Sequence, residues 1–341
     1  MNKRTKTALI VAAVMIAAGF AISFAAYGKG EGFPGLGWSF SPGSGVNFGS
    51  EIGYTVCRDG ELRFAPEEVR QLEVEWWISG EVSVESYDGS TLLLREESDR
   101  ELSDGQRMRW KLSGQRLSLR FCGNGQHNIP SKHLTVLVPQ DWLGEEITVD
   151  TASAAISFRD LRVNETLKAD ATSGRVRLEN CVCSSLLADT TSGAIELKDC
   201  RVRGTLRLSS TSGSADLSGC TAEKLYIDTT SGRVRFDGEA SELHVDTISG
   251  GANLNVQGEG CRADVSSISG AVSLCFDGRP GQVEVETTSG RVELVFAEGT
   301  GLDLDYDTVS GDMSGRALYF GEGGVPVKVD TISGDLKLEY R

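Results

Sequence analysis

The chain has 341 residues, among them 41 glycines and 7 prolines, and its formal net charge is −15. This charge argues against nucleic acid as a partner, because phosphate backbones are bound by lysine and arginine with release of counterions. Abundant glycine and few long helix-forming runs favour an all-β chain with many turns.

The first 27 residues differ in character from the rest. Residues 1–7 carry Lys3, Arg4 and Lys6, and residues 8–27 are uncharged and long enough for a helix that crosses a hydrocarbon core of about 30 Å. Positive charge before the apolar run predicts that residues 1–7 are cytoplasmic and that the remainder lies outside the cell. We expect a single-pass signal anchor in the cell membrane. A cleaved signal peptide is the alternative, since Ser23-Phe24-Ala25 offers small residues.

Two segments follow before any regular pattern begins. Residues 28–50 are rich in glycine, serine and proline, which predicts a flexible tether. Residues 51–146 alternate strand-like runs with turns without a constant period, and Pro66-Glu67-Glu68-Val69 fits a short helical turn. A stretch around Ser79-Gly80 resembles a divergent copy of the repeat described next. We expect residues 51–146 to form a β-rich cap over the end of a repeat array, where sheet edges need cover.

A Thr-x-Ser-Gly tetrapeptide recurs through residues 147–341 at intervals of 18 to 23 residues. A fixed period near 20 residues predicts units that bury their apolar side only by stacking on neighbours. Glycine suits a corner where a Cβ would clash or where φ must be positive. The predicted corner residues are Ser173, Gly174, Ser192, Gly193, Ser212, Gly213, Ser231, Gly232, Ser249, Gly250, Ser269, Gly270, Ser289, Gly290, Ser310, Gly311, Ser333 and Gly334, and Ser153 begins a degenerate copy with Ala154 in place of glycine.

Apolar residues alternate with polar ones on both sides of each corner. Leu243 and Val245 lie six and four residues before Ser249, and Val272 and Leu274 lie three and five residues after Ser269. A period of two places such residues inside and their neighbours outside. The change from even to odd spacing adds one residue at Ser-Gly, so the strand bends there. The pattern predicts a single-chain β-solenoid of about ten coils, each made of two strands that meet at a Ser-Gly corner.

An acidic column stands three residues before the repeat serine. It contains Asp150, Asp170, Asp189, Asp228, Asp246, Asp307 and Asp330. Stacked coils would place these carboxylates about 5 Å apart, where like charges disfavour each other unless something compensates. We expect a structural role in which Asp accepts hydrogen bonds at the corner and solvent screens the charge. A row of weak calcium sites is the alternative, because calcium prefers several carboxylate and carbonyl oxygens.

The hydroxyl and thiol columns also favour structural roles. Serine and threonine recur in every coil while the chain has only 3 histidines, whereas a catalytic hydroxyl needs a unique base beside it. Cys181, Cys200 and Cys220 lie eight residues after the repeat serines, with Cys183 nearby. We expect a buried thiol ladder. One disulfide within it and a metal site are the alternatives. We expect no catalytic residue, no resident metal and no cofactor.

The stretch Leu134-Thr135-Val136-Leu137-Val138-Pro139, then Ile147-Thr148-Val149-Asp150-Thr151 and the Ser-Gly repeats, resembles a bacterial family named for adhesins, whose domain has no known function. The resemblance covers about residues 54–341 and implies a β-solenoid on the outer side of a membrane. It implies little about activity, because a fold does not settle function. The missing glycine at Ala154 and the cysteine column depart from the family pattern.

Three functions remain open from the sequence. The first is a non-catalytic, membrane-anchored surface protein that contacts a cell-wall glycan or another surface protein through its extended faces. The second is an accessory or sensor of envelope-stress signalling, coupled through the membrane helix. The third is a carbohydrate-active β-helix lyase or hydrolase, which would need a localised cleft with two or three unique acids or a basic residue. Even repetition of the acids along the coils favours the first.

Overall fold

The computed structural model describes residues 39–41, 45–77, 80–315 and 323–341. These residues divide between two compact units, Gly32–Gly204 and Thr205–Arg341, called the first and the second unit below. The predicted cytoplasmic tail (1–7) and membrane anchor (8–27) lie outside the described residues, as does most of the predicted tether (28–50). Within the described ranges, no helix has the length and apolar character needed to cross a bilayer.

The first unit is built from strands and one short 3-10 helix. Its elements are β1 (Ser39–Ser41), β2 (Gly45–Asn47), β3 (Thr55–Val56), β4 (Glu61–Phe64), η1 (Pro66–Glu68), β5 (Gln71–Trp76), β6 (Glu81–Tyr87), β7 (Leu92–Ser98), β8 (Arg109–Ser113), β9 (Arg116–Arg120), β10 (Lys132–Pro139), β11 (Glu146–Thr151), β12 (Ala155–Arg159), β13 (Thr166–Ala171), β14 (Val176–Glu179), β15 (Val182–Cys183), β16 (Ser185–Thr190), β17 (Ile195–Lys198) and the start of β18 (Arg201–Ser210). The predicted helical turn at Pro66 is therefore confirmed.

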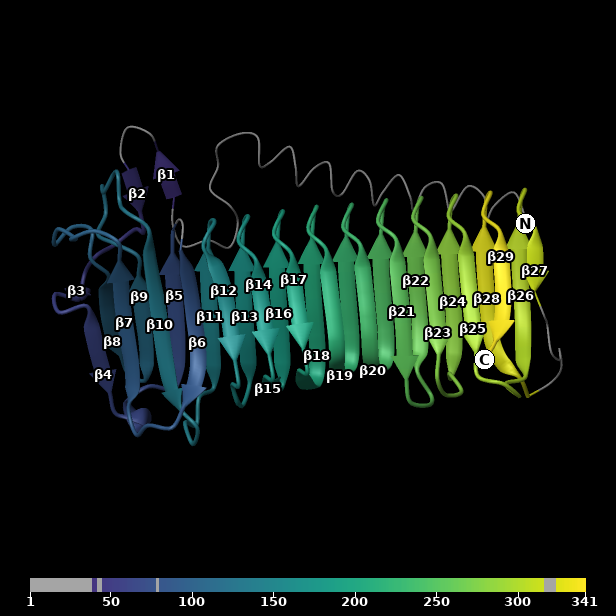
Figure 1. The fold of residues 1–341 in the computed structure, drawn as a ribbon, viewed down its shortest axis with the longest axis horizontal. Helices are drawn as coiled ribbons and strands as arrows, with labels where there is room; N and C mark the ends of the chain where they lie inside the picture. Colours follow the sequence, from purple (N-terminus) through teal and green to yellow (C-terminus); the bar gives the residue numbers. More distant parts are fainter. Residues whose placement is uncertain (1–38, 42–44, 78–79, 316–322) are drawn as a thin grey trace. The chain divides into compact units, whose positions relative to one another are not determined.

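Parallel strands stack in register to form the coils of the first unit (Figure 1). One row of stacked strands contains β5, β11, β13 and β16, and it aligns Glu75, Asp150, Asp170 and Asp189. A second row contains β10, β6, β12, β14 and β17. Since β5 and β6 lie beside β11 and β12, the segment around Gly80 is a first coil, as its sequence predicts. The predicted β-solenoid is confirmed for this unit.

The cap departs from this parallel pattern. Strand β8 pairs antiparallel with β3 and β9, and β7 pairs antiparallel with β4 and β10. Strand β9 then lies parallel to β5, which continues the sheet into the coils. The mixture explains why residues 51–146 keep no constant period: antiparallel neighbours are joined by turns of unequal length rather than by whole coils.

An ion pair is fully enclosed in the cap. The Lys132 side chain is 0 % exposed, and its Nζ lies 2.6 Å from Glu96 Oε1. The same ammonium group donates to the carbonyl oxygens of Gln106 and Phe121 and lies 5.1 Å from the centre of the Trp76 ring. Burial lowers the pKa of Lys132, and the carboxylate of Glu96 opposes that shift. The carboxylate and the carbonyl oxygens compensate the loss of water around the ammonium group, which an unpaired buried lysine would lack.

The second unit has the same coil construction. Its strands are the end of β18, β19 (Ala215–Thr229), β20 (Val234–Thr247), β21 (Ala252–Gln257), β22 (Arg262–Ser267), β23 (Val272–Phe276), β24 (Gln282–Thr287), β25 (Val292–Phe296), β26 (Leu302–Thr308), β27 (Met313–Gly315), β28 (Val325–Thr331) and β29 (Leu336–Tyr340). Inward-facing Leu243, Val245, Val272 and Leu274 are at most 1 % exposed. The predicted alternation of inward and outward residues is confirmed.

Each corner is held by the repeat residues themselves. Thr247 Oγ1 accepts from Gly250 N at 3.0 Å and donates to Gly250 O at 3.1 Å, while Ser249 Oγ donates to Thr230 O in the neighbouring coil. A Cβ on Gly250 would lie 1.9 Å from Gly232 O. Glycine is therefore required at the corner because the coils stack closely. A positive φ angle is not the reason, since none of the predicted corner glycines has one.

The last coil in the sequence is not the last coil in the stack. Strand β28 pairs with β24 on one side and β26 on the other, and β29 pairs with β25 and β27. Figure 1 shows β28 and β29, in yellow, between β25 and β26. Strand β29, the last in the sequence, is thus covered by β27 of the same chain.

Candidate functional site

Four neighbouring parallel strands of the first unit end at one edge and place polar side chains there. The strands are β10, β6, β12 and β14, in which Pro139 pairs with Tyr87, and Arg159 pairs with both Glu85 and Glu179. Residues that follow the strand ends, or occupy the last positions of a strand, therefore gather at the same edge of the sheet.

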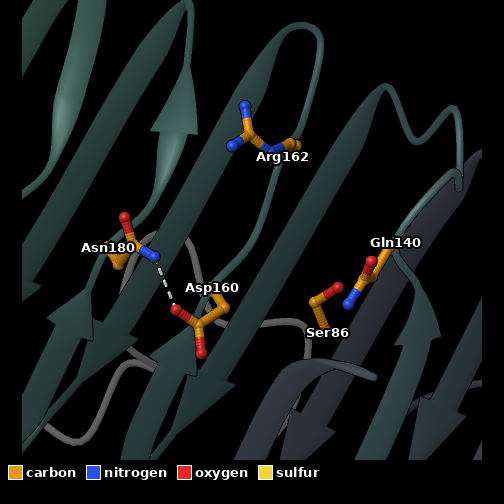
Figure 2. A pocket seen from close by; sticks show the side chains of 5 residues that line it. All are labelled: Ser86, Gln140, Asp160, Arg162 and Asn180. Atoms are coloured by element: carbon orange, nitrogen blue, oxygen red, sulfur yellow. Dashed lines mark hydrogen bonds between the residues drawn. The ribbon is translucent and has the colours of Figure 1, made fainter. Parts of the chain in front are cut away.

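A polar cleft of about 420 Å³ lies at this edge, and it is lined by Ser86, Gln140, Asp160, Arg162 and Asn180. Figure 2 shows Ser86 and Gln140 side by side on one flank, Asp160 and Asn180 joined on the other, and Arg162 apart from both pairs. The volume lies within the range of small-molecule pockets, roughly 300–1,000 Å³. Ser86 and Gln140 come from the non-repeating segment, so the cleft occurs where cap and coils meet within the first unit.

The acidic flank of the cleft has an unusual backbone. Asp160 and Asn180 have φ angles of 56° and 53°, in the left-handed region that asparagine and aspartate tolerate better than other side chains. Their positions seven residues after the repeat serine stack in adjacent coils, so Asn180 Nδ2 donates to Asp160 Oδ1 at 2.6 Å. Asp199, one coil further, has the same conformation. The bond leaves Asp160 Oδ2 and Asn180 Oδ1 as acceptors.

Arg162 supplies the cation of the cleft. Its side chain is exposed, and its backbone pairs with Val182 in the next coil. Neighbouring arginines are engaged: Arg159 lies 3.2 Å from Glu85 Oε2, and Arg203 donates to Asn164 O. Among the described residues, the Arg162 guanidinium has no hydrogen-bond or ion-pair partner. It can therefore meet an anion without losing a protein contact.

Sequence reasoning missed these five residues. Their chemistry is ordinary, and only their stacking makes a site. The available signal was the polar residue seven positions after each repeat serine, Asp160, Asn180 and Asp199, followed by an inward Leu161 or cysteine. Gln140 carried no signal, because it follows the strand that ends in Pro139 outside the repeat.

The predicted acidic column exists, and in the first unit it contains a close carboxyl pair. Asp150 stacks on Asp170, and the Oδ1 atoms of both are buried without a donor partner. Burial, and then the Asp170 charge, raises the pKa of Asp150 to about 8, and the charge of Lys168 opposes this rise. Lys168 Nζ lies 2.6 Å from Asp170 Oδ2. The arrangement suits a proton shared by the two carboxyl groups.

Several other acids in these rows have a cation beside them. Arg120 lies 2.7 Å from Glu75, and in the second unit Arg207 lies 2.7 Å from Asp228 and Lys328 lies 3.0 Å from Asp330. Burial, followed by the charge of Asp228, raises the pKa of Asp246. In the part of the chain that the structure describes, no group of three or more histidines, cysteines or acids has the geometry to hold a metal ion. The described residues therefore offer no set of ligands for the calcium sites considered as an alternative.

The cysteines lie inside the coils as thiols. Cys181, Cys183, Cys200 and Cys220 are all 0 % exposed, and none of the chain's eight cysteines forms a disulfide. A hydrogen bond with Cys200 and burial raise the pKa of Cys181. Buried neutral thiols pack as small apolar groups, so the column fills the interior.

Comparison with known proteins gives a family match and a match to a solved chain. The model of the family Toastrack DUF4097 matches residues 58–276 and 191–339. A solved chain from Clostridium sporogenes ATCC 15579, a "putative cell adhesion protein", is similar over 82 % of this chain and 99 % of its own, with 7 % identity and a TM-score of 0.17. No curated protein matches the sequence.

Proposed function

The chain belongs to the Toastrack DUF4097 family, and from this we propose that it is a non-catalytic surface protein, anchored in the cell membrane by residues 8–27, whose β-solenoid attaches to a component of the cell envelope. The resemblance to the bacterial family named for adhesins, read from the sequence, agrees with the family match. The coils present long faces of outward polar side chains, and such faces suit attachment to an extended partner.

The polar cleft is the observation that supports attachment at a defined place. It is lined by residues that donate and accept hydrogen bonds and by a single carboxylate, Asp160, which already accepts from Asn180. Glycoside hydrolysis uses two carboxyl groups about 5 to 10 Å apart. The lining therefore favours binding over hydrolysis, and it supports a cell-wall glycan or another surface protein as the partner.

Co-sedimentation tests the proposal. The purified full chain, in vesicles, is mixed with wall and membrane fractions from cells that produce it, and the bound fraction is measured against added protein. We expect saturable binding to one fraction, and protease added to intact cells should degrade residues 51–341. Absence of binding to every fraction would reject attachment, and complete protection from protease would reject the surface location.

A further inference from the structure

We propose that the cleft lined by Ser86, Gln140, Asp160, Arg162 and Asn180 binds a carboxylate-bearing sugar, with Arg162 pairing the carboxylate and the Asp160–Asn180 pair accepting ligand hydroxyls. The proposal rests on the proposed function, since it assigns a ligand class to the cleft described there. It depends on three features of the lining, taken in turn below.

The first feature is the unengaged guanidinium. Within the described residues, no acid forms an ion pair with the Arg162 guanidinium. Its planar fork of N–H donors matches the two oxygens of a carboxylate, and such a bidentate pair is both stronger and more directional than a neutral hydrogen bond.

The second feature is the separation of donors from acceptors. Ser86 and Gln140 lie on one flank and can donate through a hydroxyl and an amide (Figure 2). On the other flank Asn180 has committed its amide to Asp160 Oδ1, which leaves the Asn180 oxygen and Asp160 Oδ2 to accept. A molecule with an anionic group and several hydroxyls fits both flanks, whereas a purely apolar ligand fits neither.

The third feature is the charge balance of the lining. One cation, Arg162, stands against one anion, Asp160. Counted with both side chains, a bound monocarboxylate leaves the site with a single net negative charge, whereas a phosphate dianion leaves two such charges next to Asp160. The lining therefore favours a monocarboxylate over a phosphate dianion. A cleft of about 420 Å³ is large enough for a ligand of one or two sugar rings.

The coil repeat itself supplies a matched control. Arg162 pairs with Val182 in the next coil, and Val182 pairs with Arg201 in the coil after that. Arg201 is exposed like Arg162 and occupies the same column, but it does not line the cleft. Arg162→Gln and Arg201→Gln therefore remove the same charge from equivalent surface positions.

The test is a calorimetric titration of the full chain, in vesicles, with sodium glucuronate, glucose, inorganic phosphate and a short oligomer of glucuronate. Circular dichroism and the melting temperature confirm that each variant is folded. We expect glucuronate to bind at least tenfold more tightly than glucose or phosphate, and Arg162→Gln to weaken it at least tenfold, whereas Arg201→Gln leaves it unchanged.

The oligomer identifies the source of the ligand. Tighter binding of the oligomer than of the monomer supports a wall polysaccharide, and equal binding supports a free sugar acid. Equal affinity for glucose and glucuronate, or equal loss in the two arginine variants, overturns the proposal. If envelope fractions still bind the wild-type chain while no sugar acid does, the attachment function stands and the ligand assignment falls. If neither envelope fractions nor sugar acids bind, both the attachment function and the ligand assignment are rejected.

Discussion

Lys328 Nζ lies 2.6 Å from Glu284 Oε1, although 44 residues separate them in the sequence. The contact exists because β28 has entered the stack between β24 and β26. Glu284 and Asp305 both pair with Lys328, one from each side. If the coils stacked in the order of the sequence, Glu284 would lie directly opposite Asp305, and like charges in that position are destabilising. The hydrogen bond to Glu284, with Asp330 assisting, raises the pKa of Lys328. The lysine therefore favours the observed order of the coils.

Reversal of the Lys328 charge should loosen the end of the second unit. Lys328→Glu faces Glu284, Glu286 and Asp330, so we expect a loss of about 1 kcal/mol in the free energy of unfolding, a modest value because the pair is partly exposed and screened. Urea denaturation measures the loss. The double variant Glu284→Lys with Lys328→Glu should recover at least half of it, and no recovery would show that charge order is not the cause.

The buried pair in the cap gives a larger effect. Lys132→Met leaves the Glu96 carboxylate enclosed without its cation, and breaking such a pair costs about 3–5 kcal/mol. Denaturant titration of the full chain should show this loss. Lys132→Met combined with Glu96→Gln removes both charges and should regain most of the stability. A single variant as stable as the wild type would contradict the enclosed ion pair.

Asp150 predicts a specific dependence of stability on pH. Its pKa rises in the folded chain to about 8 from an ordinary value of 3.8, so the folded state holds more protons than the unfolded state between these values. Stability from this group is complete at low pH, falls as pH rises through that window, and stays low above about pH 8. The surrounding charges are Asp170, Lys168 and Glu75.

Replacement of Asp150 by asparagine removes that proton and keeps the shape of the side chain. Unfolding free energies of wild type and variant are measured at pH 5, 7 and 9. We expect the stability of the variant relative to the wild type to increase as pH rises. Asp88→Asn, at an exposed acid of the same unit, is the control and should follow the wild-type profile. Parallel profiles for Asp150→Asn and wild type would contradict the shared proton.

Most of the coil architecture could be predicted from the sequence because the same restraints recur in every coil. The alternation of apolar and polar residues predicts which side chains face inward, and the spacing of the Ser-Gly pairs predicts where the corners lie. The order of the last coils could not be predicted, because β26 and β28 carry interchangeable patterns of inward residues. Their order depends on outward charges such as Lys328, which are read only after strands are paired.

The cleft was hidden for a different reason. Asp160 and Asn180 are 20 residues apart, and their hydrogen bond depends on both residues adopting a left-handed conformation in stacked turns, seven residues after the repeat serines. Gln140 reaches the same edge because β10 lies beside β6, a pairing between the non-repeating segment and the first coil. Periodicity predicts contacts only between equivalent positions of repeated units, so a site that combines repeated and unrepeated residues cannot be inferred from it.

Thermal unfolding of two adjacent glycine variants tests most directly whether equivalent residues of neighbouring coils lie over one another. A Cβ on Gly250 would lie 1.9 Å from Gly232 O, whereas a Cβ on Gly251 would have nothing closer than Ala271 O at 3.5 Å. Gly250→Ala should lose about 3 kcal/mol of stability, and Gly251→Ala should lose little or none. Equal melting temperatures for the two variants would contradict in-register stacking at the corners.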